Sequence, residues 1–158
     1  MYDEKFMRRA IELSAQALEK PGTKPYAAVI VKGGRVVGEG LNQSPKNFDP
    51  TSHGEVEAIR DACRNLKTLD LSGCELYTSC EPCSLCVSTM TISGIARMYY
   101  AASAAQSDSV IPRPAHLRGD RLRKQVALPT GKREMPTEQQ LDGDAFAVLK
   151  EWAKRQKT

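Results

Sequence analysis

Apolar residues follow helical spacing at the start of the chain and then gather into short runs. Residues 3–20 predict an amphipathic helix, which Pro21-Gly22 ends. A continuous apolar run over 27–31 predicts a strand that is buried on both faces. The pair Gly33-Gly34 predicts a tight hairpin turn into a second strand over 35–39. The apolar positions of the first helix are Phe6, Met7, Ala10, Ile11, Leu13, Ala17 and Leu18.

The middle of the chain continues this alternation. Residues 42–52 predict a polar loop, and a second helix is expected to start near His53. Residues 76–78 and 97–101 predict a third and a fourth strand. Pro82 suits the first position of a third helix, because proline has no N–H to lose there, and this helix is expected to run to about Ser93. The expected buried face of the second helix consists of Val56, Ile59, Ala62, Cys63 and Leu66.

The pattern weakens between residues 103 and 143, where prolines and glycines interrupt it. Short helical pieces and one strand near 124–128 are expected there. A last helix covers about 144–156, with Phe146, Leu149 and Trp152 on one side. Helices that alternate with short strands predict a single α/β domain over residues 1–158, a three-layer α/β/α sandwich with a mixed sheet. Residues 103–158 are its less regular C-terminal segment.

Length, composition and net charge limit the class of protein and the partners that can be expected. The chain has 158 residues, of which 41% are hydrophobic and 27% charged, so it can build a core and stay in solution. No run of about 18 apolar residues occurs that could span a membrane. The acidic start, Met1 to Glu4, lacks the features of a signal peptide, and we therefore expect a cytoplasmic protein. The net charge of +4 is too mild to argue for an anionic partner.

The cysteines divide into two groups. Five cysteines, an odd number, argue against a disulfide framework in a chain with no secretion signal. Cys63 and Cys74 fall in helix and strand patterns, where we expect small buried side chains. Cys80, Cys83 and Cys86 cluster instead. With His53, the pair Cys83 and Cys86 would give a catalytic zinc ion three ligands and leave a fourth position for water.

Glu55 stands two residues after His53 and would lie over that open position. Two thiolates cancel the charge of Zn²⁺ and weaken it as a Lewis acid. A carboxylate that takes the proton of a zinc-bound water, and later returns it to a leaving group, would offset this weakness. A second interpretation of Glu55 stays open, because Ser52-x-x-Glu55 also fits a capping box at the N-terminus of a helix.

Other chemistry is possible for the cysteine cluster. A Cys-x-x-Cys pair can be redox-active, although a thioredoxin-like context is absent here. The spacing of Cys80, Cys83 and Cys86 also resembles part of an iron–sulfur run, which lacks a fourth cysteine in this chain. Taken together, His-x-Glu followed by Pro-Cys-x-x-Cys is the zinc-deaminase signature.

Several stretches carry a resemblance to the cytidine deaminase superfamily, and within it most closely to the bacterial guanine deaminases of that fold. The similarity runs from about residue 5 to 110 and is most specific around the zinc motifs. The stretches are 28–34 with the glycine turn, Gly40-Leu41-Asn42, the run from Asp49 to Val56, Ala58-Ile59-Arg60, the run from Leu76 to Cys83, and Tyr100-Ala101-Ala102.

The resemblance implies a five-stranded sheet and a homodimer, with exchange of C-terminal segments between subunits as one form of it. It implies hydrolytic removal of an exocyclic amine from a purine-like ring. The family's substrate-binding positions fall on Asn42, Gly54, Tyr26, Asp108 and Pro82. Two departures concern the pocket wall and not the metal site. Gly54 replaces the usual alanine, as in fungal-type cytosine deaminases, and 91–94 lack the bulky aromatics and arginine typical of guanine deaminases.

The expected function is therefore zinc-dependent deamination of a nucleobase, with guanine, converted to xanthine and ammonia, as the leading substrate. The alternatives are cytosine, a nucleoside such as guanosine or cytidine, and other amino-heterocycles. Deamination of adenosine in transfer RNA would need the basic segment 113–133, which we interpret as a solvated face, so nucleic acid is not expected. A non-enzymatic zinc module would leave Glu55 and Asn42 unexplained.

Overall fold

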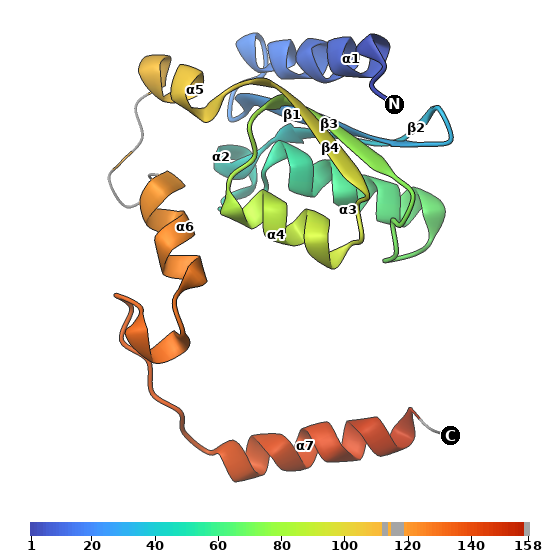
Figure 1. The fold of residues 1–158 in the computed structure, drawn as a ribbon. Helices are drawn as coiled ribbons and strands as arrows, with labels where there is room; N and C mark the ends of the chain where they lie inside the picture. The colour runs from blue at the N-terminus through green and yellow to red at the C-terminus, as the bar shows by residue number, and fades with distance from the viewer. Residues whose placement is uncertain (112–113, 115–118, 157–158) are drawn as a thin grey trace. The chain divides into compact units, whose positions relative to one another are not determined.

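The computed structural model describes residues 1–111, 114 and 119–156 (Figure 1). It divides into two compact units, Met1–Leu122 and Arg123–Thr158, which are described separately. The elements of the first unit are α1 (Glu4–Ala15), a 3-10 turn (Gln16–Leu18), β1 (Lys24–Lys32), β2 (Arg35–Asn42), α2 (Ser44–Asn47), α3 (Gly54–Leu66), β3 (Glu75–Cys80), α4 (Ser84–Ile92), β4 (Arg97–Ala102) and α5 (Ala104–Val110). Helix α6 (Gly119–Ala127) straddles the boundary, and a 3-10 turn (Thr130–Lys132) and α7 (Asp142–Arg155) follow.

The sheet has the strand order β2-β1-β3-β4. Strand β1 pairs antiparallel with both β2 and β3, and β3 pairs parallel with β4, so the sheet is mixed as predicted. Four strands occur in the described part of the chain, one fewer than predicted. The strand predicted near 124–128 is wrong, because α6 occupies most of this stretch. Leu122 and Val126 stand four residues apart among good helix formers, which is helical spacing.

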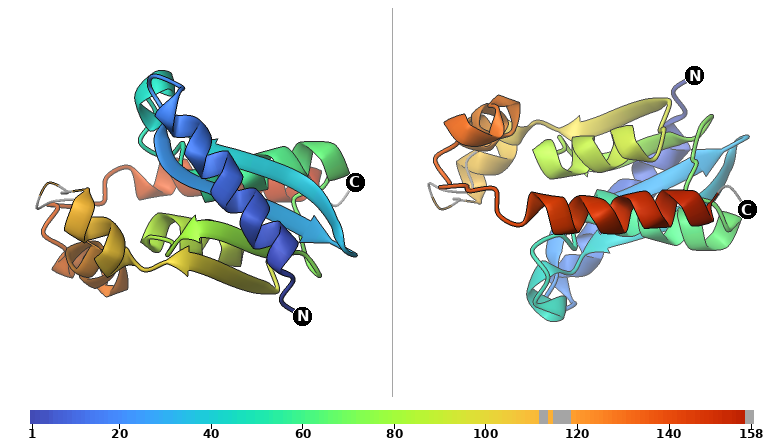
Figure 2. Two further views of the ribbon diagram at one scale, coloured as in Figure 1. Left: turned by 90° about the horizontal axis from the view of Figure 1, so that it is seen from above. Right: turned by 90° about the horizontal axis from the view of Figure 1, so that it is seen from below.

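Helices cover both faces of the sheet and confirm the three layers (Figures 1 and 2). Helix α1 lies on one face and buries Phe6, Met7 and Leu13 against Val29 and Tyr77. Helices α3 and α4 lie on the other face. Their buried side chains meet the sheet there in a second cluster, which includes Val56, Ile59, Ala62, Cys86, Met90, Ile30 and Leu76. The prediction that residues 27–31 are buried on both faces is correct.

Helix α1 is shorter than predicted. It ends at Ala15, and a 3-10 turn follows. Ile11 and Leu18, expected to be buried, are 46% and 84% exposed. The buried stripe of α1 is therefore narrower than the apolar pattern indicated.

Backbone contacts hold α3 against the sheet. A Cβ added to Gly40 would meet the carbonyl oxygen of Gly54 at 2.2 Å, and one added to Gly38 would meet that of Ala58 at 2.5 Å. No other residue type fits at these two positions of β2 without moving the helix. The start of α3, which carries the candidate site, therefore has a fixed place above β1 and β2.

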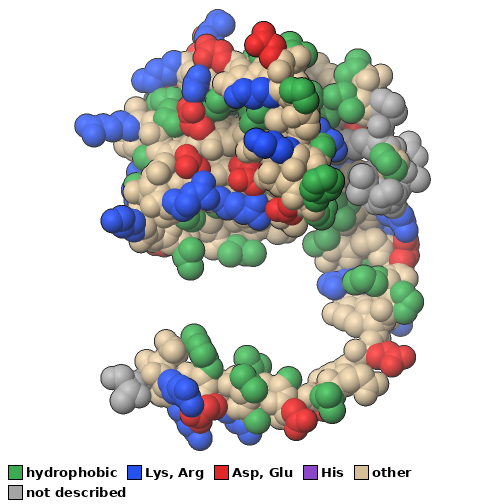
Figure 3. Space-filling model, turned by 180° about the vertical axis from the view of Figure 1, so that it is seen from behind, with side chains coloured by type: hydrophobic (Ala, Val, Ile, Leu, Met, Phe, Trp, Pro, Cys, Tyr) green, Lys and Arg blue, Asp and Glu red, His purple; other side chains and the backbone are tan. Residues whose placement is uncertain are grey.

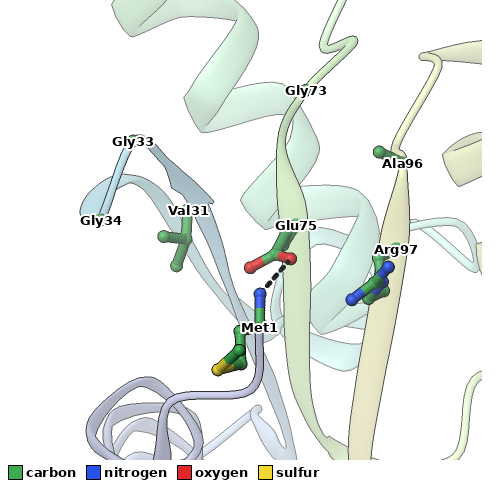
Figure 4. Close-up of a pocket in the computed structure, with 8 residues that line it drawn as sticks. All are labelled: Met1, Val31, Gly33, Gly34, Gly73, Glu75, Ala96 and Arg97. Carbon is green, nitrogen blue, oxygen red and sulfur yellow. Dashed lines mark hydrogen bonds and ion pairs between the residues drawn. The ribbon is translucent and has the colours of Figure 1, made fainter.

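A surface hollow of about 380 Å³ lies beside the Gly33-Gly34 turn, where both glycines have positive φ (Figure 4). The ammonium group of Met1 pairs there with the carboxylate of Glu75 at 3.4 Å. Glu75 begins β3, whereas the candidate site follows Cys80 at the other end of that strand. The hollow is therefore separate from the predicted site.

Helix α7 of the second unit starts two residues earlier than predicted. Phe146, Leu149 and Trp152 are each about 60% exposed, and hydrophobic side chains show along this helix in Figure 3. Over the described residues, no helix combines the length and apolar character needed to cross a membrane.

Candidate active site

Three predicted ligands come together in the structure. The Nδ1 atom of His53 lies 3.5 Å from the Sγ of Cys83 and 3.4 Å from the Sγ of Cys86. The two sulfur atoms are 3.7 Å apart. Within the described residues, this is the group of histidine, cysteine and acidic side chains whose geometry could hold a metal ion.

The triangle formed by these three atoms fits zinc. Tetrahedral Zn²⁺ with Zn–S bonds of about 2.3 Å and Zn–N bonds of about 2.0–2.1 Å requires S–S and S–N separations of about 3.8 and 3.6 Å. The separations in the structure, 3.7, 3.5 and 3.4 Å, agree to about 0.2 Å. Because one face of a tetrahedron has three corners, this donor set leaves one position for another ligand.

Both ligand segments stand at helix starts. His53 and Cys83 are the N-cap residues of α3 and α4, with extended backbone and no capping hydrogen bond from their side chains. Cys86 lies in the first turn of α4. Pro82 precedes α4 and is not its first residue as predicted, because Cys83 takes the extended cap conformation that directs its thiol to the site. The positive ends of two helices therefore face the sulfur atoms, which favours thiolates.

Glu55 lies directly against this cluster. Its Oε2 atom accepts a hydrogen bond from the Cys86 thiol at 3.3 Å, and its Oε1 atom lies 3.3 Å from the hydroxyl of Thr78, which can donate to it. The side chain is buried. The capping box proposed for Ser52 and Glu55 does not form, because Glu55 turns to the cluster and the Ser52 hydroxyl donates to Glu57.

The electrostatics of the metal-free cluster follow from these contacts. The hydrogen bond with Cys83 raises the pKa of His53. The hydrogen bond with Cys86, assisted by that with His53, lowers the pKa of Cys83 to about 4. The same bond, together with burial, raises the pKa of Cys86. Burial also raises the pKa of Glu55, because a charged carboxylate loses its solvation there.

The predicted substrate-binding residues occupy different surroundings. Asn42 is buried at the end of β2, and its Oδ1 accepts from the backbone N–H of Ser44. Tyr26 shares a hydrogen bond with Ser107 of α5 at 2.9 Å. A Cβ atom added to Gly54 would lie 2.5 Å from the carbonyl oxygen of Tyr26, so the backbone of Gly54 packs directly against β1. Asp108 is an exposed residue of α5.

Sequence reasoning missed three residues that support the site. Thr78 is fully buried beside Glu55, and Ser107 is buried beside Tyr26. The carboxylate of Glu81, next to Pro82, accepts the backbone N–H of Ala104 at 2.8 Å and so ties the start of α5 to the cysteine loop. A polar residue inside a strand, as at Thr78, is the signal that could have found the first of them.

Comparison with known proteins places this site in context. The model of the family described as "Cytidine and deoxycytidylate deaminase zinc-binding region" matches residues 1–102. Guanine deaminase of Bacillus subtilis is 41% identical over 102 residues, which are 65% of this chain and 65% of that protein, a little under two thirds of its length. A tRNA-specific adenosine deaminase of Aquifex aeolicus is 37% identical over 111 residues, 70% of this chain and 73% of that protein.

The solved structures that resemble this chain differ in the share of it that they cover. The crystal structure of the Bacillus subtilis guanine deaminase matches with a TM-score of 0.84 at 32% identity and covers 98% of this chain and 95% of its own. A structure from work on tRNA:A34 deaminases matches with a TM-score of 0.61 at 34% identity and covers 64% of this chain and 72% of its own. The second likeness therefore leaves out about a third of the chain.

Proposed function

The chain belongs to the cytidine and deoxycytidylate deaminase zinc-binding family, and we propose that it removes the exocyclic amine of a free nucleobase by hydrolysis, with guanine as the leading substrate. The observation that carries this proposal is the buried carboxylate of Glu55. It lies 3.3 Å from the Sγ of Cys86, which is one of the three side chains that could hold a metal ion. A structural zinc site would have a fourth protein ligand in place of an open position and would need no such carboxylate beside it.

His53, Cys83 and Cys86 would hold the zinc ion, which when bound supplies a Lewis acid that lowers the pKa of water. Glu55 takes a proton from the attacking water at its Oε2 atom, because its Oε1 atom faces the hydroxyl of Thr78. Burial favours this, since it raises the pKa of Glu55 and makes the carboxylate a better base. Glu55 would deliver this proton to the ring nitrogen, and would then take the second proton of the attacking water and pass it to the departing amine, which leaves as ammonia. Guanine and water give xanthine and ammonia in this way.

The wall of the pocket is proposed from the resemblance and from the contacts. Because Oδ1 of Asn42 is engaged with Ser44, its amide N–H groups remain as donors to a ring acceptor. Tyr26 and Asp108 would contribute through α5, to which Tyr26 is hydrogen-bonded. Pro82 and the backbone of Gly54 would complete the wall next to the metal ligands.

A small purine is favoured over transfer RNA by the extent of the structural match. The guanine deaminase structure covers 98% of this chain, whereas the tRNA deaminase structure covers 64% of it. The face of the first unit that Figure 3 shows intermixes acidic and basic side chains. Residues 112–113 and 115–118 of the basic segment lie outside the described residues.

A homodimer is also proposed. Helix α4 has no charged residue, and Val87 and Ile92 on it are 44% and 87% exposed. In the described chain, the outer edge of β4 has no partner strand, and Met98 and Tyr100 are exposed there. A second copy would cover such surfaces. Exchange of the C-terminal segment and a cytoplasmic location stay predictions. Light scattering of the purified protein tests the dimer, and a monomer mass at working concentration would contradict it.

Ammonia release from a panel of substrates tests the activity. The panel contains guanine, adenine, cytosine, guanosine and cytidine, each with zinc-loaded protein and with Glu55→Gln as the blank. We expect release from guanine. Release from another member would replace guanine and keep the deaminase, whereas release from none would favour a non-enzymatic zinc module.

The second candidate function, deamination of adenosine in transfer RNA, rests on the sequence similarity to the Aquifex enzyme. A gel shift with transfer RNA at rising salt, together with an inosine assay, tests it. Tight, salt-sensitive binding with inosine formation would place this function ahead of guanine. Binding that is absent at 150 mM salt would exclude it.

A further inference from the structure

Ser52 directly precedes the metal ligand His53 and is fully buried. Its hydroxyl donates to Oε1 of Glu57 at 2.8 Å and accepts from the side-chain amide of Asn47 at 3.0 Å. Burying a hydroxyl costs free energy unless its hydrogen bonds are made, and here both are made by side chains. Ser52 is therefore held in one orientation.

Glu57 connects this hydroxyl to the body of α3. It stands one turn after His53, and its Oε1 atom also accepts from the guanidinium of Arg60. Arg60 reaches back to the hydroxyl of Thr51 at 3.1 Å and pairs with Asp49 at 3.6 Å. The segment before His53 is thus bonded to the helix that follows it, with His53 between the two ends.

The backbone carbonyl group of Ser52 is bonded to the residues that follow β2. It accepts from the backbone N–H of Gln43 at 3.0 Å and from the hydroxyl of Ser44 at 3.2 Å. These donors come directly after Asn42, whose own side chain is bonded to Ser44. One buried residue therefore joins the end of β2 to the start of α3.

We propose that Ser52 and Glu57 are positioning residues that fix the imidazole of His53 in the metal-binding triangle. The proposal rests on the metal site of the proposed function but not on the identity of its substrate. His53 has extended backbone and no side-chain capping bond of its own, so its helix start is held by the neighbouring bonds. The distance from its ring nitrogen to a bound metal must stay within about 0.2 Å of the usual metal–ligand value. A loosened backbone would not maintain that distance.

Zinc affinity measures this role separately from turnover. Ser52→Ala removes the hydroxyl, and Glu57→Ala removes its acceptor. We expect each to weaken zinc binding by about 10-fold or more, within the range for residues that orient metal ligands. Glu57→Gln keeps the Oε1 acceptor and should restore affinity to within about threefold of the parent protein, as a rescue.

Asp61→Asn is the matched control. Asp61 is a carboxylate on the same helix that accepts from the backbone N–H of Glu39, outside the site. Competition with a chromophoric chelator gives the zinc dissociation constant, and the Co²⁺-thiolate absorption of cobalt-substituted protein reports ligand geometry. Both are measured well below the unfolding midpoint of each variant. We expect Asp61→Asn to keep the parent affinity and spectrum.

Two results would overturn the inference. Ser52→Ala and Glu57→Ala could bind zinc within twofold of the parent with unchanged cobalt spectra, or Asp61→Asn could lose affinity equally. If Ser52→Ala does not fold, Glu57→Ala decides, because the Glu57 side chain is 17% exposed and its loss is better tolerated. A parent protein that fails to bind zinc would instead contradict the proposed function.

Discussion

The carboxylate of Glu55 and the thiol of Cys86 lie 3.3 Å apart, although they are 31 positions apart in the chain. The contact joins the first turn of α3 to the first turn of α4, across the end of β3. It places a buried acid next to one of the three side chains that could hold a metal ion, as the proposed role of Glu55 in proton transfer requires.

Glu55→Gln should abolish nearly all turnover, by about 10²–10⁴-fold, because the amide cannot take a proton. Zinc content should stay at about one per chain, and the unfolding midpoint should stay equal or rise, since a neutral amide is easier to bury than a carboxylate. Glu75→Gln, at the other end of β3, is the control and should retain activity. Substantial turnover by Glu55→Gln would refute its role.

Removing one ligand should empty the metal site. Cys86→Ser replaces a buried sulfur atom of the triangle, so zinc measured by atomic absorption should fall from about one per chain to a small fraction. Cys63→Ala removes a half-buried thiol that is outside the triangle, and we expect full zinc content. Equal zinc in both variants would mean that other side chains hold the ion.

Gly54→Ala should destabilise the first unit by about 1–3 kcal/mol, because its Cβ would meet the backbone of β1. The forced shift of α3 should also lower zinc affinity. Urea unfolding and chelator competition measure the two effects. Gly143→Ala in α7 has open space around the added atom and serves as the control. A Gly54→Ala protein as stable as the parent would show that α3 can move freely.

Stability should decrease at alkaline pH partly through Tyr77. Burial raises the pKa of its hydroxyl above the ordinary 10.0. The unfolded chain therefore loses this proton first as the pH rises, so the stabilisation is complete below about pH 10 and is lost as the pH passes through the folded pKa. In Tyr77→Phe this part of the decrease should disappear, at a cost of about 1 kcal/mol at neutral pH for the bond to Asp3. Urea unfolding between pH 7 and 11 measures both, and an unchanged slope in Tyr77→Phe would contradict this.

Local chemistry was predictable where one signal dominated. The buried run at 27–31, the glycine turn and the meeting of His53, Cys83 and Cys86 all follow from residue type and spacing. The fate of Glu55 did not, because a capping box and a buried base fit the same sequence. The long-range contacts with Thr78 and Cys86 exclude the capping box, and the role of Glu55 as a base stays a proposal.

The C-terminal part was harder to predict for a physical reason. The strand predicted near 124–128 rested on few apolar residues, and over so short a stretch apolar periodicity alone does not separate a strand from the helix that forms there. Phe146, Leu149 and Trp152 did lie on a helix, but their exposure depends on what that helix packs against, which its own sequence does not state.

The contact of α3 with β2 through Gly38 and Gly40 has a consequence for how such a protein can diverge. At these two positions backbone lies against backbone, so a larger side chain cannot be introduced there without moving the helix. Selection for a different heterocycle would have to act on parts that are proposed to contact the substrate through side chains, such as Tyr26 and α5. A lineage could then exchange substrates many times while the catalytic half of the fold stays unaltered.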